Sequence, residues 1–285
     1  MSQLNFNNIY YLGPNGSNSH NAMLNILKNE NINVENQIPL KSIKMVFESL
    51  LKDENSICVL PIENSIEGIV RETIDNLAHI ENSDIKIQGE ITLPIKHLLL
   101  SKGRDKSKIK VIMSHPQALS QCSSFLHKEF FSAELKETTS TSLACEEISK
   151  LNDETIAAIA NETCAALFNL NILSSDINDE KDNKTRFYLL GREEIKYKND
   201  NGKTAIILST KNKSGALCDV LQIFKKHDIN LTYIDSRPSK RKLGEYLFFM
   251  EIDGFEQDYK IKMALEELMN YVDFIRVLGS FCVYE

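Results

Sequence analysis

Short apolar segments separated by turns and helix patterns recur along the first two thirds of the chain. The segments 9–12 (IYYL), 57–60 (ICVL), 111–113 (VIM) and 155–160 (TIAAIA) are typical of buried strands. Strands that alternate with helices in this way predict an α/β region with a parallel or mixed sheet. In such sheets, ligands bind beyond the carboxyl ends of the strands.

The turns that follow these strands contain pairs of helix-capping residues. Asn64 with Glu67, and Ser114 with Gln117, have the spacing of capping pairs, and 139–142 (TSTS) is typical of a helix start. These patterns predict that a helix begins at each of the three turns.

Ser114, Gln117 and Gln121 stand three and seven positions apart, so on a helix they would share one face. That face can be a solvated surface or the wall of a ligand site, and the residues alone favour the solvated surface.

The pattern changes after residue 190. The segment 191–203 (GREEIKYKNDNGK) is charged and has no apolar period, which is typical of a linker. Beyond it, the apolar pattern predicts the order βαββαβ of a ferredoxin-like domain, with a basic hairpin at 238–245. An exposed sheet edge in so small a domain favours pairing with a second copy.

Length and composition narrow the class of protein. A chain of 285 residues suits two or three domains, and its net charge of -7 without a Lys/Arg stripe argues against nucleic acid or an anionic membrane as partner. The sequence shows no secretion signal and no run long enough for a membrane span. Its six cysteines contain no CxxC pair, and its six histidines have no metal-ligand spacing. We expect a cytoplasmic protein with reduced core thiols and without a structural metal.

One short stretch, 183–187 (NKTRF), joins a polar loop to an apolar strand. Thr185 and Arg186 are therefore expected where a loop enters a sheet, a common position for functional side chains. Taken alone, the stretch is more typical of an ordinary turn that happens to contain Thr and Arg.

Several motifs in a fixed order resemble prephenate dehydratase, the enzyme family that acts in phenylalanine biosynthesis. They are YLGPNGSNSH at 11–20, LPIENSIEG at 60–68, SHPQALSQC at 114–122 and INDEKDNKTRF at 177–187. The segments SGALCDVLQIF at 214–224, INLTYIDSRP at 229–238, EYLFFMEIDG at 245–254 and VLGS at 277–280 are similar to the ACT regulatory domain of that family.

The resemblance implies a bilobed, periplasmic-binding-protein-like catalytic region at 1–195 and a ferredoxin-like βαββαβ ACT domain at 203–285. It implies dehydration and decarboxylation of prephenate without a cofactor, and feedback control by phenylalanine. It also implies a homodimer or homotetramer, and the net charge already argues against nucleic acid or a membrane as a partner.

The resemblance also assigns candidate site residues. It places Thr185 at the departing hydroxyl, and assigns the catalytic site Thr185, Glu63 and Arg186 and the substrate site Asn64, Ser65, Ser114, Gln121 and Phe187. Arg186 can face the cleft or be structural, because neighbours along a strand face opposite ways. Glu63 can assist the leaving group or organise its turn, and Phe187 is expected to pack. His115 is expected to be a cap or a packing element.

The implied phenylalanine site lies between two ACT domains and contains Gly215, Ala216, Leu217, Asn230, Leu231, Asp235, Ser236 and Arg237. Three positions depart from the family pattern. Ser17-Asn18 replaces the usual Thr-Phe, Ser214 replaces Pro, and Asp235 replaces Glu. The last two changes are expected to weaken phenylalanine binding modestly.

Two other functions compete with this one. Arogenate dehydratase removes the same groups from the amino-acid analogue of prephenate. A non-catalytic binding or sensor module is the other alternative, because bilobed α/β proteins often bind solutes.

Overall fold

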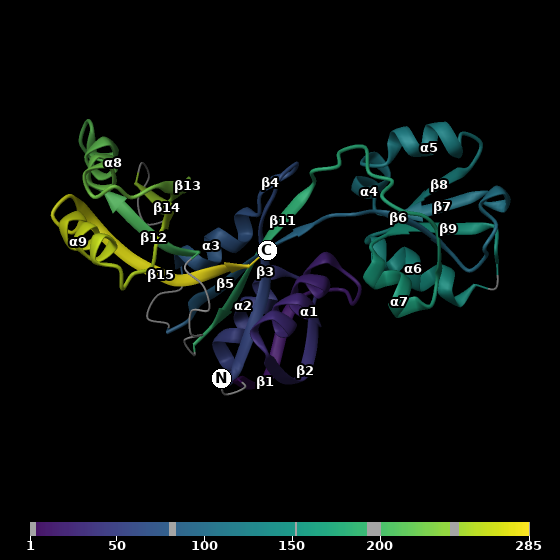
Figure 1. Cartoon of the computed structure of the whole chain (residues 1–285), viewed down its shortest axis with the longest axis horizontal. Helices are drawn as coiled ribbons and strands as arrows, with labels where there is room; N and C mark the ends of the chain where they lie inside the picture. The colour runs from purple at the N-terminus through teal and green to yellow at the C-terminus, as the bar shows by residue number, and fades with distance from the viewer. Residues whose placement is uncertain (1–3, 80–83, 152, 193–200, 240–244, 285) are drawn as a thin grey trace.

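The computed structural model describes all residues except 1–3, 80–83, 152, 193–200, 240–244 and 285. Three bodies lie in a row in Figure 1. A first lobe occupies the centre, with a second lobe on one side and a C-terminal domain on the other.

The first lobe is a mixed sheet between helices. Its strands follow the order β5-β11-β3-β1-β2, in which β1, β2 and β3 are parallel and β11 is antiparallel to both β3 and β5. Its elements are β1 (Leu4–Leu12), α1 (Asn18–Glu30), β2 (Ile32–Leu40), α2 (Ile43–Lys52), β3 (Ser56–Asn64), β4 (Gly68–Ile69), α3 (Arg71–His79), β5 (Lys86–Pro94) and β11 (Lys184–Gly191).

The second lobe has its own five-stranded sheet, in the order β10-β6-β9-β7-β8. Its elements are β6 (Leu98–Ser101), η1 (Lys106–Lys108), β7 (Val111–Ser114), α4 (Pro116–Ser120), α5 (Ser123–Glu129), β8 (Glu134–Glu137), α6 (Thr141–Lys150), β9 (Ile156–Ala160), α7 (Glu162–Phe168) and β10 (Asn171–Ser174). Apolar side chains of β9, such as Ile159, are fully buried, as the sequence predicts.

Two segments, 95–97 and 175–183, connect the lobes (Figure 1). They bond to each other: the Ile95 N–H donates to the Asn183 carbonyl at 2.8 Å, and the Ile177 N–H donates to the His97 carbonyl at 3.0 Å. The two connecting segments are therefore hydrogen-bonded to each other, although neither forms a regular strand.

The C-terminal domain has the predicted order βαββαβ. It consists of β12 (Gly202–Thr210), α8 (Ala216–Lys226), β13 (Leu231–Pro238), β14 (Tyr246–Asp253), α9 (Tyr259–Leu268) and β15 (Val272–Tyr284). The end of β15 pairs in parallel with β5, so this sheet continues into that of the first lobe, and β13 forms its outer edge. The helices α8 and α9 cover one face of the sheet, and the other face shares a core with α2 and α3.

Two of the three predicted helix starts are confirmed and one is wrong, although α4 is capped by His115 and not by Ser114. Ser114 ends β7, and the His115 ring caps α4 by accepting the Gln117 N–H, so Ser114 shares no helix face with Gln117. Asn64 closes a turn before β4, and α3 begins only at Arg71. Ser140 caps α6 as expected.

Parts of two sequence expectations fall outside the described residues, namely most of the linker 191–203 and most of the hairpin 238–245. All six cysteines lie in the described part of the chain and form no disulfide; five are buried and Cys218 is exposed. None of the described helices has the length and apolarity needed to cross a bilayer.

Candidate functional site

Thr185 lies near the start of β11, between two neighbouring strands. It pairs with Asn64 on β3 and with Leu93 on β5, and only 8% of it is exposed. The loop-to-strand position that the sequence predicted is therefore confirmed.

Asn64 fixes the direction of the hydrogen bond that it makes with Thr185. The Asn64 side-chain oxygen accepts the backbone N–H groups of Ile66 and Glu67, each at 3.0 Å. Backbone N–H groups can only donate, so the other atom of the amide must be the nitrogen. This nitrogen donates to the Thr185 hydroxyl oxygen at 2.9 Å and to the Asn183 side-chain oxygen at 2.8 Å.

The Thr185 hydroxyl consequently has its proton to give. Its oxygen accepts from Asn64, and no acceptor for its proton lies among the described residues. A hydroxyl whose proton has no acceptor can donate a hydrogen bond to an oxygen of a ligand bound near the start of β11.

The amide network continues from the first lobe into the second. The Asn183 nitrogen donates to the Gln121 side-chain oxygen at 3.3 Å, and the His97 Nε2 lies 3.0 Å from the same oxygen. Asn183 and His97 are buried, and burial lowers the pKa of His97, against the effect of its bond with Gln121. This network connects Thr185 to both lobe-to-lobe segments.

A cleft of about 630 Å³ lies between the lobes next to this network. It is lined from the first lobe by Ile66 and Glu67, and from the second lobe and the connecting segment by Pro116, Gln117, Ser120, Gln121, Asn178, Asp179, Glu180 and Asn183. Gln121 and Asn183 thus belong both to the cleft wall and to the amide network.

Arg186 points away from Thr185, as strand alternation requires, into a buried charge cluster. Its guanidinium pairs with Glu251 of β14, with Glu90 at 3.3 Å and with Glu63 at 3.5 Å. Lys203 of β12 pairs with Glu90 at 3.1 Å and with Glu251 at 3.3 Å. The cluster therefore joins the strand that carries Thr185 to the C-terminal domain.

Burial is the largest cause of the raised pKa values of Glu90 and Tyr188 in and beside this cluster. Burial and the neighbouring Glu251 raise the pKa of Glu90, while Arg186 and Lys203 oppose that rise. The Tyr188 hydroxyl donates to Glu251, and burial with that carboxylate raises the pKa of Tyr188 well above its usual value.

The remaining predicted site residues are placed differently. Ser65 is exposed and its hydroxyl donates to the Asp182 carbonyl at 3.3 Å. Ser114 is fully buried and donates to the Ile159 carbonyl at 2.7 Å. Phe187 packs in the core of the first lobe. Ser114 and Phe187 are therefore not part of the described cleft lining.

Sequence reasoning missed His97 and Asn178 and assigned no role to Asn183. Asn178 and Asn183 stand inside the motif 177–187, which could have drawn attention to them. His97 follows a proline-containing strand end and carries no motif signal, so only its contact with Gln121 identifies it.

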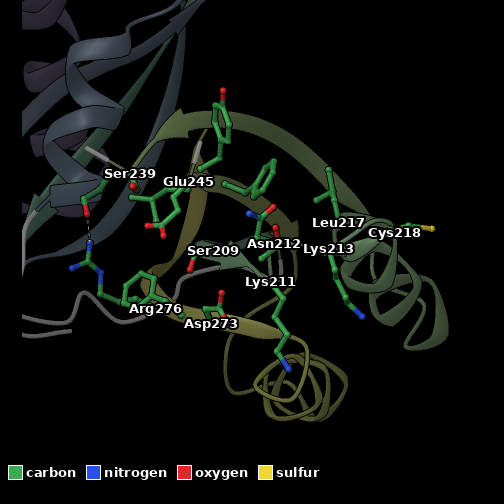
Figure 2. A pocket seen from close by; sticks show the side chains of 18 of the residues that line it. Ser209, Lys211, Asn212, Lys213, Leu217, Cys218, Ser239, Glu245, Asp273 and Arg276 are labelled. Carbon is green, nitrogen blue, oxygen red and sulfur yellow. Dashed lines mark hydrogen bonds between the residues drawn. The ribbon is translucent and has the colours of Figure 1, made fainter. Parts of the chain in front are cut away.

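A second cavity, of about 750 Å³, lies where the C-terminal domain meets α3. Figure 2 shows its walls: Ser209 lies at the end of β12, Lys211 to Lys213 follow that strand, Leu217 and Cys218 lie in the first turn of α8, and Asp273 and Arg276 come from β15. The guanidinium of Arg276 donates to the carbonyls of Leu77 and Ala78 at the end of α3, at 2.8 and 3.1 Å. This cavity therefore contacts both the C-terminal domain and the first lobe.

The predicted effector residues fall into two groups. Gly215, Ala216 and Leu217 line this cavity at the start of α8. The other group follows α8, lies on or next to the edge strand β13, and does not line the cavity. It consists of Asn230, Leu231, Asp235, Ser236 and Arg237. Asp235 pairs with Arg237 at 2.6 Å, and Arg237 reaches Asp75 of α3 at 3.5 Å.

Within the described part of the chain, no three His, Cys, Asp or Glu side chains gather closely enough to hold a metal ion. The hydrogen-bonded network beside the cleft consists of amides, a hydroxyl and an imidazole, and the cleft lining adds the carboxylates of Glu67, Asp179 and Glu180.

Comparisons with known proteins identify the family to which the chain belongs. The family model of prephenate dehydratase matches residues 9–195, and that of the ACT domain matches residues 204–268. A prephenate dehydratase of Methanocaldococcus jannaschii is 42% identical over 246 residues, covering 86% of this chain and 87% of that protein. A prephenate dehydratase of Lactococcus lactis subsp. cremoris is 35% identical over 280 residues, covering 97% and 98%. The crystal structure of the Arthrobacter aurescens prephenate dehydratase in complex with L-Phe matches with a TM-score of 0.83 and 29% identity, covering 96% of this chain and 89% of that one. The chain therefore belongs to the prephenate dehydratase family of lyases and carries an ACT domain.

Proposed function

We propose that the chain converts prephenate to phenylpyruvate, with loss of CO2 and water, and that phenylalanine regulates this reaction. The observation that carries the catalytic part is the direction of the bond between Asn64 and Thr185. It leaves the Thr185 proton available to the hydroxyl that departs from the ring.

The chemistry needs few protein groups. The bond to the ring carboxylate breaks and its electrons enter the ring, the C–O bond of the ring hydroxyl breaks, and the departing hydroxide takes a proton to become water. Because aromaticity is gained, the enzyme mainly has to orient the substrate and stabilise the departing oxygen. A threonine hydroxyl is a very weak acid, so Thr185 acts as a hydrogen-bond donor or proton relay.

Substrate contacts fall to the cleft wall and to the turn after β3. Asn64, Ser65 and Gln121 supply amide and hydroxyl groups, and Asn183 joins them from the connecting segment. Ser114 and Phe187 shape the site from the two cores behind it. Glu63 and Arg186 hold the orientation of β11 from its opposite face.

The regulatory part of the proposal places one phenylalanine between two copies of the chain. Gly215 and Asn230 flank opposite ends of α8, whose 11 residues span roughly 16 Å, so one small ligand cannot touch both within one chain. A two-fold arrangement along the edge strand β13 would bring the start of one α8 next to Asn230 of the partner.

Asp235 tests this regulatory site, because it is one methylene shorter than the Glu usual in the family. Asp235→Glu should tighten inhibition by phenylalanine and leave the uninhibited kcat unchanged. A shift of kcat instead would place Asp235 outside the effector site.

The decisive experiment is a phenylpyruvate-formation assay with prephenate, run with and without phenylalanine. Turnover that phenylalanine suppresses is the expected result. Tight prephenate binding without turnover would show that the chain is a binding module and not an enzyme. Turnover that does not change at millimolar phenylalanine would refute the regulatory part of the proposal.

One observation favours arogenate as a second substrate. The cleft lining carries the carboxylates of Glu67, Asp179 and Glu180 and, among the described residues, neither Lys nor Arg. Both substrates carry the same two carboxylates, and they differ in that arogenate has an ammonium group where prephenate has a keto group. Carboxylates of the cleft attract that ammonium group and have no such attraction for a keto group. The same assay with arogenate decides between the substrates by the ratio of the two kcat/KM values.

A further inference from the structure

We propose that His97 is a positioning residue for this reaction, holding the Gln121 carboxamide so that its N–H groups, and not its oxygen, are offered to the substrate. The inference rests on the proposed function, and it adds a residue that lies behind the cleft wall.

The orientation of every amide in the network follows from two backbone groups. The N–H groups of Ile66 and Glu67 fix the oxygen of Asn64, so the Asn64 nitrogen must donate to the oxygen of Asn183. The nitrogen of Asn183 is then the group that faces Gln121.

The side-chain oxygen of Gln121 must accept the hydrogen bond from the Asn183 nitrogen, because that nitrogen can only donate. Because the same oxygen lies 3.0 Å from the His97 Nε2, that ring nitrogen must carry a proton and donate as well. Two donors thus saturate the Gln121 oxygen. Its nitrogen is buried, has no partner in the described part of the chain, and belongs to a residue that lines the cleft.

The unpartnered amide nitrogen of this cleft-lining residue suits an acceptor oxygen of the substrate, and prephenate offers carboxylate and keto oxygens. If the oxygen of Gln121 took that place, it would face the substrate oxygen with a lone pair. The bond from His97 opposes this rotation, because a flipped amide would turn N–H groups toward the donors of His97 and Asn183.

The backbone around His97 keeps its ring in place. The His97 N–H donates to the Asn178 oxygen at 2.6 Å, and the Asn178 nitrogen donates to the Ile95 carbonyl at 2.9 Å. His97 is 6% exposed, and its Nδ1 is buried without a partner among the described residues. A neutral ring protonated at Nε2 fits this environment, and burial lowers the pKa of His97 accordingly.

The test combines a conservative rescue with a double-mutant cycle, using phenylpyruvate formation by the full chain. His97→Leu removes the donor and should lower kcat/KM by roughly 10- to 100-fold. His97→Gln restores an N–H near the position of Nε2 and should stay within about fivefold of wild type. In a Gln121→Leu background, His97→Leu should cost less than about twofold, since the group it positions is absent.

Thermal unfolding of each variant separates positioning from folding, and His97→Met replaces His97→Leu if the latter does not fold. The inference is overturned if His97→Leu keeps wild-type activity, if His97→Gln is as damaged as His97→Leu, or if the two single effects multiply in the double variant. A wild-type chain that forms no phenylpyruvate would instead refute the proposed function.

Discussion

The chemistry of Thr185 depends on the turn that follows β3. Asn64 donates to the threonine oxygen because its own oxygen is held by two backbone N–H groups. A residue with no charge thereby acquires a defined role, that of a donor.

Removing this donor should cost most of the catalytic rate. Thr185→Ala should fold normally and lose about 100- to 1,000-fold in kcat, the usual effect of deleting one donor at a developing oxyanion. Thr185→Ser keeps the hydroxyl and serves as the matched control, which should lie within about tenfold of wild type. Steady-state phenylpyruvate formation measures both, and an alanine variant within a few-fold of wild type would contradict the assignment.

Asn64→Asp should be damaging for a reason that its pH dependence reveals. The introduced carboxylate keeps an oxygen for Ile66 and Glu67 but turns the donor toward Thr185 into an acceptor. Thr185 would then give its proton to the carboxylate, and kcat should fall about as far as in Thr185→Ala.

Protonation of the introduced carboxyl restores a donor, so the ratio of variant to wild-type kcat should rise as pH falls. A ratio that stays flat, or that falls toward acid, would mean that the Asn64 nitrogen does not set the direction of the Thr185 bond.

Residue patterns identified Thr185 but could not orient it. The stretch 183–187 is recognisable because its loop-to-strand transition is local in sequence. The bond that orients it joins Asn64 to Thr185 across 121 positions, and no local pattern encodes it. For Ser114, a local pattern is present but misleading. Its spacing from Gln117 is that of a capping pair, yet its hydroxyl donates to the Ile159 carbonyl of a neighbouring strand.

At the scale of elements, β11 serves two parts of the molecule at once. Its alternation places Thr185 on the side of the amide network and Arg186 on the side of β14. Helix α3 makes a second connection, because Arg276 and Arg237 of the C-terminal domain contact it. The segment just before α3 is β4, which pairs with Glu63 and Asn64. A displacement of the C-terminal domain would therefore reach Thr185 by two connections. One runs through Arg186 on β11, and the other runs through α3 and β4 to Asn64.

The charge cluster on β11 predicts a pH-dependent stability. Burial raises the folded-state pKa of Glu90, so the stability due to its protonated form is present below the ordinary pKa of Glu and is lost as pH rises through the raised value. Glu90→Gln cannot ionise. The free energy of unfolding of Glu90→Gln, minus that of wild type, should therefore increase from about pH 4 to pH 8.

Glu129 provides a control of opposite sign. Its hydrogen bond and charge pairing with Lys106 lower its pKa, so its contribution is present above the ordinary pKa and is lost toward acid. The same difference for Glu129→Gln should therefore decrease as pH rises. Urea unfolding at a series of pH values measures both, and equal slopes for the two variants would contradict the burial argument.

For the whole molecule, the sequence predicted the parts better than their connection. The βαββαβ order is visible because each element has its own apolar period. The joining of the two sheets is not, because it depends on three residue pairs between the end of β15 and β5, nearly 200 positions apart. The shared core under the C-terminal sheet likewise combines α2 and α3 with strands from the other end of the chain.

The final prediction concerns the assembly that phenylalanine requires. Gly215→Ala changes the loop before α8 through backbone strain alone, because Gly215 has a φ of +79° and a Cβ there would meet nothing within 4 Å. Asn230→Ala removes the other half of the proposed site. Each variant alone should keep kcat and lose inhibition by phenylalanine.

A mixture of the two variants should regain part of the inhibition. In a two-fold dimer, one site combines the intact Gly215 loop of one chain with the intact Asn230 of the other, and random exchange makes about half of the dimers mixed. Inhibition curves of the mixture, before and after exchange by dilution and reconcentration, measure the recovery. Two differently tagged copies confirm that subunits have exchanged. If exchange occurs and inhibition does not return, both halves of the site must come from the same chain. That result would contradict the proposed pairing of two copies along β13.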